Sequence, residues 1–313
     1  MVRGVGEGSG AEEVLLLEYA VDVGGTKIAY AIVDKARILA EDSVATDGLP
    51  PEERLPAVGK TLRALAKDRG VRPFCAGLSL PGPIAHGALL HAPNLHGAWV
   101  GRSISEFFSM LDLGVPGAAQ RDALLGGLGE YAAGAGQGLQ SFAYLTLGTG
   151  VGGALIVEGH LLLGADGAAG EIGHLTAEPR GPVCGCGRRG CVEAIASGTA
   201  IAKIYTAETG EEVHGAEIAR RARSGERAAK KVFARAGIAL GIACAAWAQV
   251  ANPQAVICGG SLAQSLDLLL PTLERTLHRR AWEANLPLPI LPAQLGGPAP
   301  LVGAAHYARQ SAR

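Results

Sequence analysis

YAVDVGGTKIAYAIVDKARIL (Tyr19–Leu39) and AYLTLGTGVGGALIVEGHLLL (Ala143–Leu163) are two stretches of this sequence that match each other without a gap. The match pairs Gly24 with Gly148, and each copy has the pattern of a strand, a glycine-rich turn and a second strand. Self-similarity over such a distance predicts two related α/β halves. Two unrelated hairpins that share glycine are the weaker alternative, because the match covers both strands and the turn.

The turn in each copy is suited to phosphate binding. It reads DVGGTK at Asp22–Lys27 and LGTGVGG at Leu147–Gly153. Successive glycines let backbone N–H groups approach phosphate oxygens closely. Thr26 adds a hydroxyl, Lys27 adds a positive charge, and Asp22 can hold Mg²⁺ through water. One such turn is also typical of a plain hairpin, but two copies that face each other favour a polyphosphate held between them.

The rest of the chain is expected to contain both helices and strands. Helices are expected at residues 52–68, 103–111, 122–133, 198–207, 213–223, 226–250, 262–281 and from 301, and strands at 74–80, 255–258 and 288–291. Residues 1–13 are rich in glycine and acidic residues and are expected to be disordered. The apolar run 236–251 is shorter than the roughly 20 residues that span a bilayer, so a buried helix is expected there.

Composition limits the function classes. The chain has 313 residues, which predicts two domains. Its formal charge of −1 provides no basic field, so neither nucleic acid nor a membrane is expected as a partner. The first residues lack the apolar stretch of a signal peptide. Because three of the six cysteines crowd together, a reduced compartment is favoured over a disulfide scaffold. We therefore expect a soluble, cytoplasmic protein.

Four residues in one segment predict a metal site. His174 is followed by Cys184, Cys186 and Cys191. Three thiolates and one imidazole close a tetrahedral Zn²⁺ site and leave no position for a catalytic water, so this zinc is expected to be structural. Free thiols in a surface loop are the weaker alternative, because exposed reduced cysteines are reactive.

Three carboxylates are candidates for chemistry. Glu171 and Glu193 flank the cysteine cluster, where a loop fixed by zinc presents them rigidly for the recognition of hydroxyl groups. Asp122 stands at the start of a predicted helix. The local sequence alone does not decide whether Asp122 is a helix N-cap or a general base.

Taken together, these motifs resemble those of the ROK family (repressors, open reading frames and kinases), especially its bacterial glucokinase-like members. The resemblance runs from Tyr19 to Ala305. It rests on DVGGTK at 22–27, LPGP at 80–83, APNL at 92–95, LGTGVGG at 147–153, GEIGH at 170–174, CGCGRRGCVEAIASGTA at 184–200 and ICGGSLA at 257–263.

The resemblance implies a duplicated actin-like (ribonuclease H-like) α/β ATPase fold, in which two domains hold ATP in the cleft between them. The smaller domain, with the first phosphate turn, is expected at residues 14–118 plus 300–313, and the larger, with the second turn and the zinc site, at 119–299. The implied activity is ATP-dependent phosphorylation of glucose or a related hexose, including N-acyl hexosamines, with Zn²⁺, Mg²⁺ and ATP as cofactors. A homodimer or homotetramer is expected, because the Ala/Gly-rich helix suits close packing.

The resemblance also implies the roles of single residues. Asp122 matches the catalytic base, and His174, Cys184, Cys186 and Cys191 match the zinc ligands. The nucleotide-binding residues implied are Asp22, Gly24, Gly25, Thr26, Lys27, Thr149, Gly150, Gly259 and Gly260. The residues expected to contact the sugar are Glu171, His174, Glu193, Asn94 and Arg121. For Asn94, turn chemistry beside Pro93 is an almost equal alternative.

One stretch departs from the family pattern. Members usually carry Asn-Asp-Ala-Asn around the base, whereas this chain has Arg121, Asp122, Ala123 and Leu124. Arg121 offers only donors and a fixed charge, and it is expected to lower the basicity of Asp122. Three outcomes are open: Arg121 turns away and leaves a working hexokinase, it reads a modified or acidic sugar, or it marks a weakened enzyme.

Two other functions stay open on the sequence. A non-catalytic or weakly active sugar-binding regulator of the same family is favoured only by Arg121 and Leu124. The 21 residues before Asp22 are too few for the helix-turn-helix extension that such repressors carry. A plain zinc-binding interaction module leaves the duplicated turns unexplained. The sugar kinase accounts for both turns, the base and the two carboxylates, and is the function that we predict.

Overall fold

Two five-stranded sheets with the same strand order carry the fold. The computed structural model describes residues 17–92 and 94–312, so the disorder expected at residues 1–13 lies outside the described residues. The strands of the first sheet, in spatial order, are β3 (Arg37–Ala45), β2 (Lys27–Asp34), β1 (Leu17–Val23), β4 (Cys75–Leu80) and β7 (Gly117–Arg121). Those of the second are β10 (His160–Leu161), β9 (Val151–Val157), β8 (Phe142–Leu147), β11 (Val256–Gly259) and β12 (Ile290–Pro292).

The strand directions of the two sheets correspond as well. In the first sheet, β1, β2 and β3 are antiparallel neighbours, and β4 and β7 run parallel to β1. In the second, β8, β9 and β10 are antiparallel neighbours, and β11 and β12 run parallel to β8. The predicted duplication is therefore confirmed, with β1 and β2 in the places that β8 and β9 take in the second sheet.

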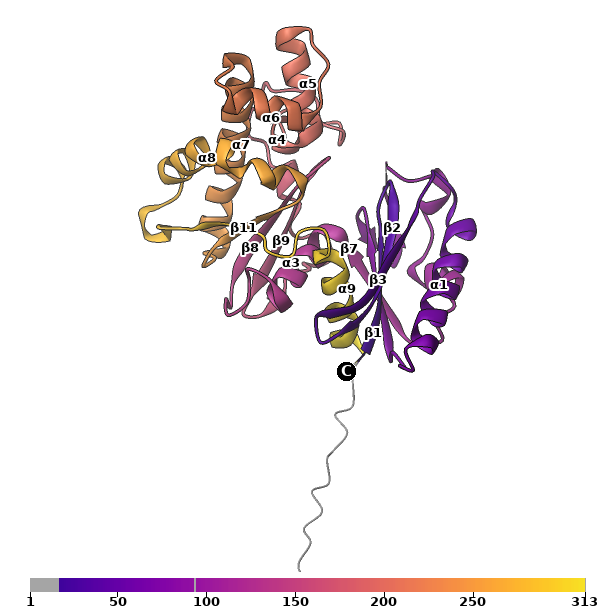
Figure 1. Cartoon of the computed structure of the whole chain (residues 1–313). Helices are drawn as coiled ribbons and strands as arrows, with labels where there is room; N and C mark the ends of the chain where they lie inside the picture. The colour runs from indigo at the N-terminus through magenta and orange to yellow at the C-terminus, as the bar shows by residue number, and fades with distance from the viewer. Residues whose placement is uncertain (1–16, 93, 313) are drawn as a thin grey trace, which may run out of the picture.

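The helices lie in three groups (Figure 1). On the outer side of the first sheet are α1 (Pro51–Asp68) and α2 (Ile104–Leu111), and between the two sheets are α3 (Asp122–Ala133) and α9 (Ala299–Ser311). Beyond the second sheet are α4 (Glu193–Ala196), α5 (Gly198–Thr209), α6 (Gly215–Arg223), α7 (Arg227–Ala251) and α8 (Leu266–Arg280). The short elements are β5 (Ile84–Ala85), β6 (Ala88–Leu89), η1 (Gly97–Trp99), η2 (Ile172–His174), η3 (Ser261–Ser265) and η4 (Glu283–Asn285).

Local signals explain where several elements begin and end. Ser103 and Glu106 form a capping box at the start of α2, and the Ser197 hydroxyl accepts the Ala200 N–H at the start of α5. The expected helix 262–281 begins as the 3₁₀ turn η3 before α8. Strand β12 starts at Ile290 rather than Leu288, because the prolines at 287 and 289 have no N–H to give to the ladder.

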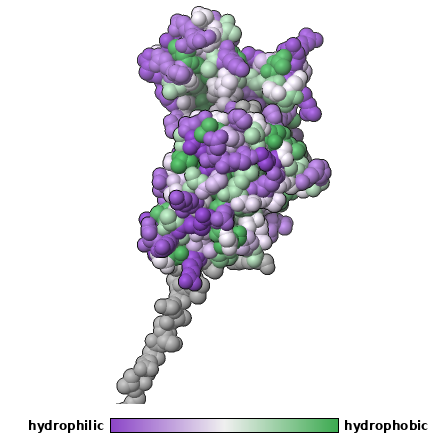
Figure 2. Space-filling view, turned by 90° about the vertical axis from the view of Figure 1, so that its right-hand side faces the viewer, coloured by the Kyte–Doolittle hydropathy of each residue, from purple (hydrophilic) through white to green (hydrophobic). Residues whose placement is uncertain are grey.

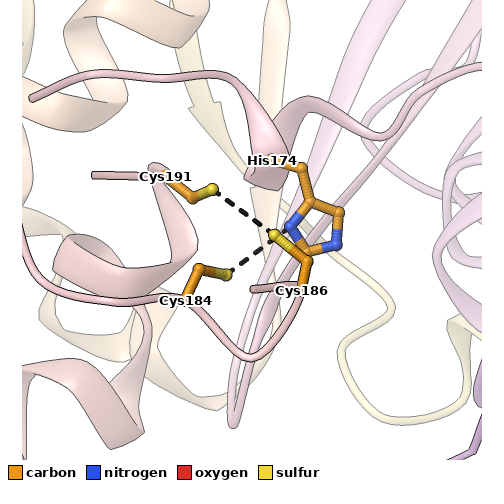
Figure 3. A group of neighbouring side chains, drawn as sticks. All are labelled: His174, Cys184, Cys186 and Cys191. Carbon is orange, nitrogen blue, oxygen red and sulfur yellow. Dashed lines mark hydrogen bonds between the residues drawn. The ribbon is translucent and has the colours of Figure 1, made fainter. Parts of the chain in front are cut away.

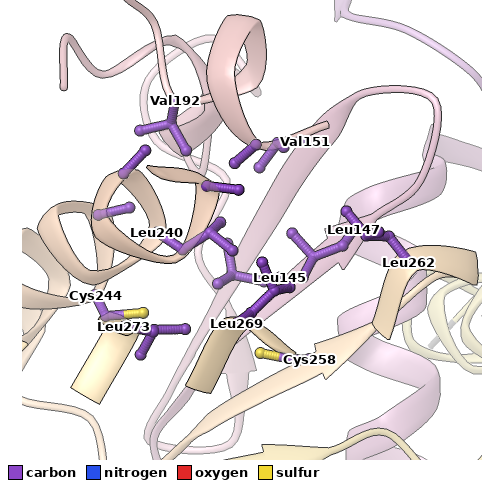
Figure 4. Close-up of a cluster of buried hydrophobic side chains, with 14 of the residues drawn as sticks. Leu145, Leu147, Val151, Val192, Leu240, Cys244, Cys258, Leu262, Leu269 and Leu273 are labelled. Carbon is purple, nitrogen blue, oxygen red and sulfur yellow. The ribbon is translucent and has the colours of Figure 1, made fainter. Parts of the chain in front are cut away.

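Helix α7 is the core helix of the second half. It is long and apolar enough to cross a membrane, but 67% of its apolar window is buried inside the protein. Leu240 and Cys244 on this helix pack with Leu269 and Leu273 of α8 and with Leu145 of β8 (Figure 4). Helix α7 is thus a buried packing element, as the sequence predicted for 236–251.

The face drawn in Figure 2 is mostly hydrophilic, with hydrophobic residues in small scattered groups.

Helices α3 and α9 touch along their backbones. A Cβ atom at Gly303 would lie 1.8 Å from the Leu125 carbonyl oxygen, and one at Gly129 would lie 2.1 Å from the Ala299 carbonyl oxygen. Only glycine fits at such an approach. Helix α9 also packs on β1, β4 and β7, and α3 packs on β8 and β9, so the pair joins the two sheets. The domain bounds 14–118 plus 300–313 and 119–299 stay a prediction.

A buried ion pair fixes α9 to the first sheet. Glu18 of β1 is fully buried, and the Arg309 Nη2 donates to its Oε2 over 2.6 Å. Burial raises the pKa of Glu18, and Arg309 opposes that shift. We expect Arg309→Met to lower the free energy of unfolding by about 3–5 kcal/mol, because the variant leaves a buried carboxylate without its partner.

Equilibrium urea unfolding measures this loss. Arg223→Met is the control, because Arg223 and Asp267 form an ion pair in which both side chains are about half exposed (46% and 55%). Its loss is expected to change the free energy of unfolding by less than about 1 kcal/mol. Equal effects of the two variants would contradict the role given to the Glu18–Arg309 pair.

Candidate active site

The first phosphate turn joins β1 to β2. The Gly24 N–H donates to the Lys27 carbonyl over 2.9 Å, and the Thr46 hydroxyl donates to the Gly24 carbonyl over 2.7 Å. These bonds hold the turn, and Thr26 and Lys27 are exposed on it. Nothing in the local sequence of Thr46 signalled its contact with this turn.

Asn94 lies against the same turn. A Cβ atom at Gly25 would come within 2.8 Å of the Asn94 Cβ. The Asn94 side chain is exposed, so it can face a ligand held by the turn. The structure therefore brings Asn94 beside the expected phosphate-binding residues Gly24 and Gly25.

Asp22 carries a buried oxygen without a hydrogen-bond partner at this turn. Its Oδ1 and the Ser79 hydroxyl, on the neighbouring strand β4, are both buried and both lack a partner among the described residues. Burial raises the pKa of Asp22 to about 6; the neighbouring Ser79 hydroxyl lowers it, the negative charge of Asp122 raises it, and Lys27 lowers it. The Ser79 hydroxyl is close enough to act on the carboxylate but does not meet hydrogen-bond geometry, and a buried carboxylate oxygen without a formed hydrogen bond fits the expectation of a Mg²⁺ held nearby.

The second phosphate turn joins β8 to β9. The Gly148 N–H donates to the Gly150 carbonyl over 3.0 Å, and the Gly198 N–H at the start of α5 donates to the Gly148 carbonyl over 2.7 Å. Thr149 is exposed at the tip of the turn. Gly260 has a φ of +84° and lies against the Leu147 backbone, so Gly259 and Gly260 also stand beside this turn.

Glu193 connects the second turn to the cysteine cluster. Its Oε2 accepts the Val151 N–H over 3.0 Å, and its Oε1 lies 3.7 Å from the Cys184 sulfur. A Cβ atom at Gly150 would lie 2.5 Å from the same Oε2, so a side chain at position 150 would displace the carboxylate. The sequence suggested separate roles for Gly150 and Glu193, whereas the structure places them in contact.

Asp122 is the first residue of α3, and Arg121 is the N-cap. The Asp122 Oδ1 accepts the N–H of its own neighbour Ala123 over 2.7 Å. Asp122 is therefore not the N-cap of the helix. Solvent reaches the carboxylate although protein surrounds it, and this partial desolvation raises its pKa. The Ala123 N–H and the charge of Arg121 both lower the pKa of Asp122, as expected for Arg121, but the effect of burial is larger.

Arg121 does not turn away from the residues expected to bind sugar. Its side chain is only 6% exposed, its Nη1 forms an ion pair with the Glu171 carboxylate, and its Nη2 donates to the Ala169 carbonyl. Burial lowers the pKa of Arg121. Of the three outcomes left open on the sequence, an Arg121 that faces away from these residues is therefore contradicted by the structure. Neither partner was predicted from the sequence.

His174 lies between Glu171 and the cysteines. Its Nε2 is 3.8 Å from the Glu171 Oε2, and its Nδ1 is 3.8 Å from the Cys184 sulfur (Figure 3). One ring nitrogen thus faces the thiols, and the other faces a carboxylate expected to contact sugar.

The four predicted zinc ligands lie together in the structure. One ligand atom each of His174, Cys184, Cys186 and Cys191 can be chosen so that all four lie within 4.8 Å of one another. The Cys186 and Cys191 sulfurs are 3.7 Å apart. A tetrahedron with Zn–S bonds of about 2.3 Å has sulfurs separated by about 3.8 Å, so the donor set and its spacing fit zinc. Within residues 17–92 and 94–312, no second group of His, Cys, Asp and Glu side chains meets the same test.

A hollow of about 380 Å³ opens beside the histidine. It is lined by Gly170, Glu171, Ile172, His174, Leu175, Arg188 and Trp247. Neither Asp122 nor the two glycine-rich turns line it. The hollow is thus a flank of the Glu171–His174 segment and not the place where base and phosphate meet.

A comparison with protein families decides the identity. The model of the ROK family matches residues 18–311. The chain belongs to the ROK family. As a member, it is similar to the glucokinase of Streptomyces coelicolor, with 31% identity over 316 residues that cover 94% of this chain and 98% of that protein.

Solved structures of the family agree with this assignment. The ROK hexokinase from Thermus thermophilus has a TM-score of 0.83 and 33% identity, and covers 95% of this chain and 99% of that one. The ROK glucokinase from Streptomyces griseus, in complex with glucose and AMPPNP, has a TM-score of 0.76 and 33% identity, with coverage of 94% and 99%. The actin-like fold and the sugar-kinase activity predicted from the sequence are confirmed.

Zinc content tests the metal centre of this ROK kinase. We expect inductively coupled plasma mass spectrometry to find one zinc ion bound per chain. Cys186→Ser is expected to lose the zinc and to lower the melting temperature by roughly 5 °C or more, because a closed zinc site contributes folding free energy. Cys75→Ser, a buried cysteine of β4 outside the cluster, is the control and should keep its zinc. A wild-type protein that is purified without chelators and contains no zinc would refute the site.

The buried carboxylate of Asp22 predicts a conflict between stability and nucleotide binding in the ROK kinase. Its pKa is about 6 in the folded chain, against 3.8 for an unperturbed aspartate, so the folded chain holds the proton more tightly between these values. The stability that this proton gives is complete below about pH 4 and is lost as pH rises through about 6. Asp22→Asn should therefore stabilise the nucleotide-free protein at pH 8 by about 1–3 kcal/mol, and by almost nothing at pH 4.

The same variant should lose the rise in melting temperature that Mg²⁺ and an ATP analogue give to the wild type. Thermal unfolding at the two pH values, with and without the analogue, measures both effects. A variant that is less stable than wild type at pH 8 would contradict the buried charge.

Proposed function

We propose that this ROK kinase transfers the γ-phosphoryl group of ATP to a hydroxyl of a neutral hexose, with Asp122 as the general base. The observation that carries the proposal is the position of two carboxylates at one edge of the first sheet. Asp22 lies near the carboxyl end of β1, and Asp122 follows the carboxyl end of β7, with β4 between and parallel to both strands. The charge of Asp122 raises the pKa of Asp22, as expected of neighbouring carboxylates.

The carboxylates at this edge and the residues of the two phosphate turns each have a proposed role. The Asp122 Oδ1 is occupied by the Ala123 N–H, so Oδ2 is free to take the proton of the attacking hydroxyl. Backbone N–H groups of Gly25 and Gly150 hold phosphate oxygens, while the Gly24 N–H holds the shape of the turn through its bond to the Lys27 carbonyl. Thr26, Lys27 and Thr149 are the proposed side-chain donors, and Gly259 and Gly260 lie beside the adenosine. Asp22 holds the hydrated metal ion. When bound, Mg²⁺-ATP supplies the phosphoryl group and the charge that stabilises its transfer.

Sugar hydroxyls are proposed to bind on the zinc-fixed segment. Glu171, Glu193 and the Nε2 of His174 are the contacts, and exposed Asn94 adds an amide from the side of the first phosphate turn. His174 uses its Nδ1 for zinc, so the metal fixes the orientation of the ring without touching the sugar. We further propose a cytoplasmic enzyme that forms homodimers or homotetramers.

The contacts of Arg121 favour a working enzyme over a regulator. Among the described residues, the ion pair of Arg121 is with Glu171 and not with Asp122. The base therefore keeps an oxygen free for the hydroxyl proton. The net effect of the surroundings also raises the pKa of Asp122, which strengthens it as a base.

Asp122→Asn is expected to reduce kcat for hexose phosphorylation by about 10²–10⁴-fold, because the amide accepts no proton from the hydroxyl. A coupled ADP assay with glucose, mannose and N-acyl hexosamines measures the rates with ATP as donor, and ³¹P NMR of the sugar phosphate measures them with polyphosphate. Asp267→Asn, on the exposed side of α8, is the control and should keep wild-type turnover.

Calorimetry separates this account from a sugar-binding regulator. Asp122→Asn should bind hexose within a few-fold of wild type, because Glu171 and Glu193 are unchanged. Sugar binding by the wild type without transfer from any donor would support the regulator instead, and undiminished turnover of the variant would exclude Asp122 as the base.

A further inference from the structure

The segment of residues 162–171, which we call the bridging segment, reaches from the second sheet to the first. It follows β10 and leads into η2, and both of these elements belong to the second half. A Cβ atom at Gly167, whose φ is +76°, would lie 3.3 Å from the Ile84 carbonyl oxygen and 4.0 Å from the Gln120 Nε2. Ile84 is in β5 and Gln120 is in β7, so the tip of the bridging segment rests on the first half.

Arg121 makes the second contact between the bridging segment and the first half. Its Nη1 pairs with the Glu171 carboxylate and its Nη2 donates to the Ala169 carbonyl, so both terminal nitrogens are committed to this segment. The Nε is buried and has no partner among the described residues. The backbone of Arg121 is itself fixed, because its N–H donates to the Gln120 Oε1 over 2.9 Å.

The charges around Arg121 argue against an anionic substrate. A guanidinium that is 6% exposed and paired with a carboxylate has no free positive charge for a ligand. The other charged residues proposed to face the sugar, Asp122 and Glu193, are both acidic, and Arg188 in the hollow beside His174 offsets only one of these two charges. A sugar acid would therefore meet net negative charge, whereas neutral hydroxyl groups would meet hydrogen-bond acceptors.

We propose that Arg121 is a positioning residue that latches the bridging segment, and with it Glu171, onto the end of β7 next to Asp122, and so makes the site selective for neutral hexoses. This rests on the proposed function in that Glu171 and Asp122 act on the same substrate. The latch holds Glu171 by one oxygen before sugar arrives and leaves the Oε2, on the His174 side, for a hydroxyl. Sugar then binds to a pocket that is already assembled.

Hydrogen–deuterium exchange of the ligand-free protein tests the latch without any reference to catalysis. The Ala169 N–H, bonded to the Leu163 carbonyl over 3.0 Å, reports on the segment. In Arg121→Asn, peptides covering 163–171 should exchange at least about tenfold faster than in wild type, while peptides of α7 stay unchanged. Arg223→Asn, which removes the exposed ion pair with Asp267, should change neither. Unchanged exchange in 163–171 would overturn the latch.

Kinetics test the consequence for the substrate. Arg121→Met, which removes both terminal nitrogens and adds no amide, should raise KM for a neutral hexose by about tenfold or more and change kcat less, because the lost positioning affects ground state and transition state alike. Arg121→Lys keeps the positive charge but not the two terminal nitrogens of the guanidinium. Its KM and its exchange rate in 163–171 should therefore lie between those of wild type and those of the variant without a cation at position 121. Wild type should not prefer hexuronic acids to the neutral hexose.

The outcomes separate the latch from the proposed function. Wild type that turns over no sugar, together with faster exchange in Arg121→Asn, would refute the proposed function and leave the latch standing. Turnover by wild type with the same KM in Arg121→Met would refute the positioning role. A preference of wild type for a sugar acid, lost in Arg121→Asn, would show that Arg121 binds the substrate directly. If Arg121→Asn does not fold, Arg121→Lys decides by the same two readouts.

Discussion

Helices α3 and α9 pack so closely that the carbonyl of one stands where the other would carry a side chain, at Gly303 and at Gly129. Each helix also packs on a different set of strands, so this contact determines how the two sheets face each other. Asp122 is the first residue of α3, and its place therefore depends on the same contact. A larger residue at position 303 is therefore expected to displace Asp122, the proposed base, as well as the sheets.

The candidate site combines buried charged groups, each of which by itself lowers the stability of the folded chain. Asp22 has a buried oxygen without a donor, and burial raises the pKa of both Asp22 and Asp122. Arg121 is buried as well, but Glu171 compensates its charge. Such a set is tolerated because the parallel strands β1, β4 and β7 end at one edge and hold the groups rigidly. We propose that a substrate complex supplies the missing partners, as expected where function opposes stability.

Much of the fold was predictable from the sequence, because its signals are local. The repeated strand–turn–strand pattern predicts the duplication. Ser103 and Ser197 begin helices, and the prolines near 287 precede a strand, so each signal lies within a few residues of the element end that it marks. The clustering of the four candidate zinc ligands was predictable for the same reason, since all four fall within one short segment.

The contacts of Arg121 were not predictable, because they join residues far apart in the sequence. Ala169 is 48 positions from Arg121, and a long side chain with many rotamers can turn in several directions. The contact of Glu193 with the Val151 N–H, 42 positions away, was missed for the same reason. The local sequence also did not decide whether Asp122 is a helix N-cap or a general base. In the structure, α3 begins at Asp122 and Arg121 is its N-cap, so the N-cap role of Asp122 is excluded.

Asp122 and the two phosphate turns are proposed to serve one transfer reaction. ³¹P NMR of the wild-type protein with Mg²⁺, ATP and one neutral hexose can show this transfer. The γ-phosphate signal is expected to be replaced by the signal of a hexose phosphate in equal amount, with ADP as the other product. Release of inorganic phosphate without a sugar phosphate, or an unchanged spectrum in the presence of a sugar that binds, would contradict it.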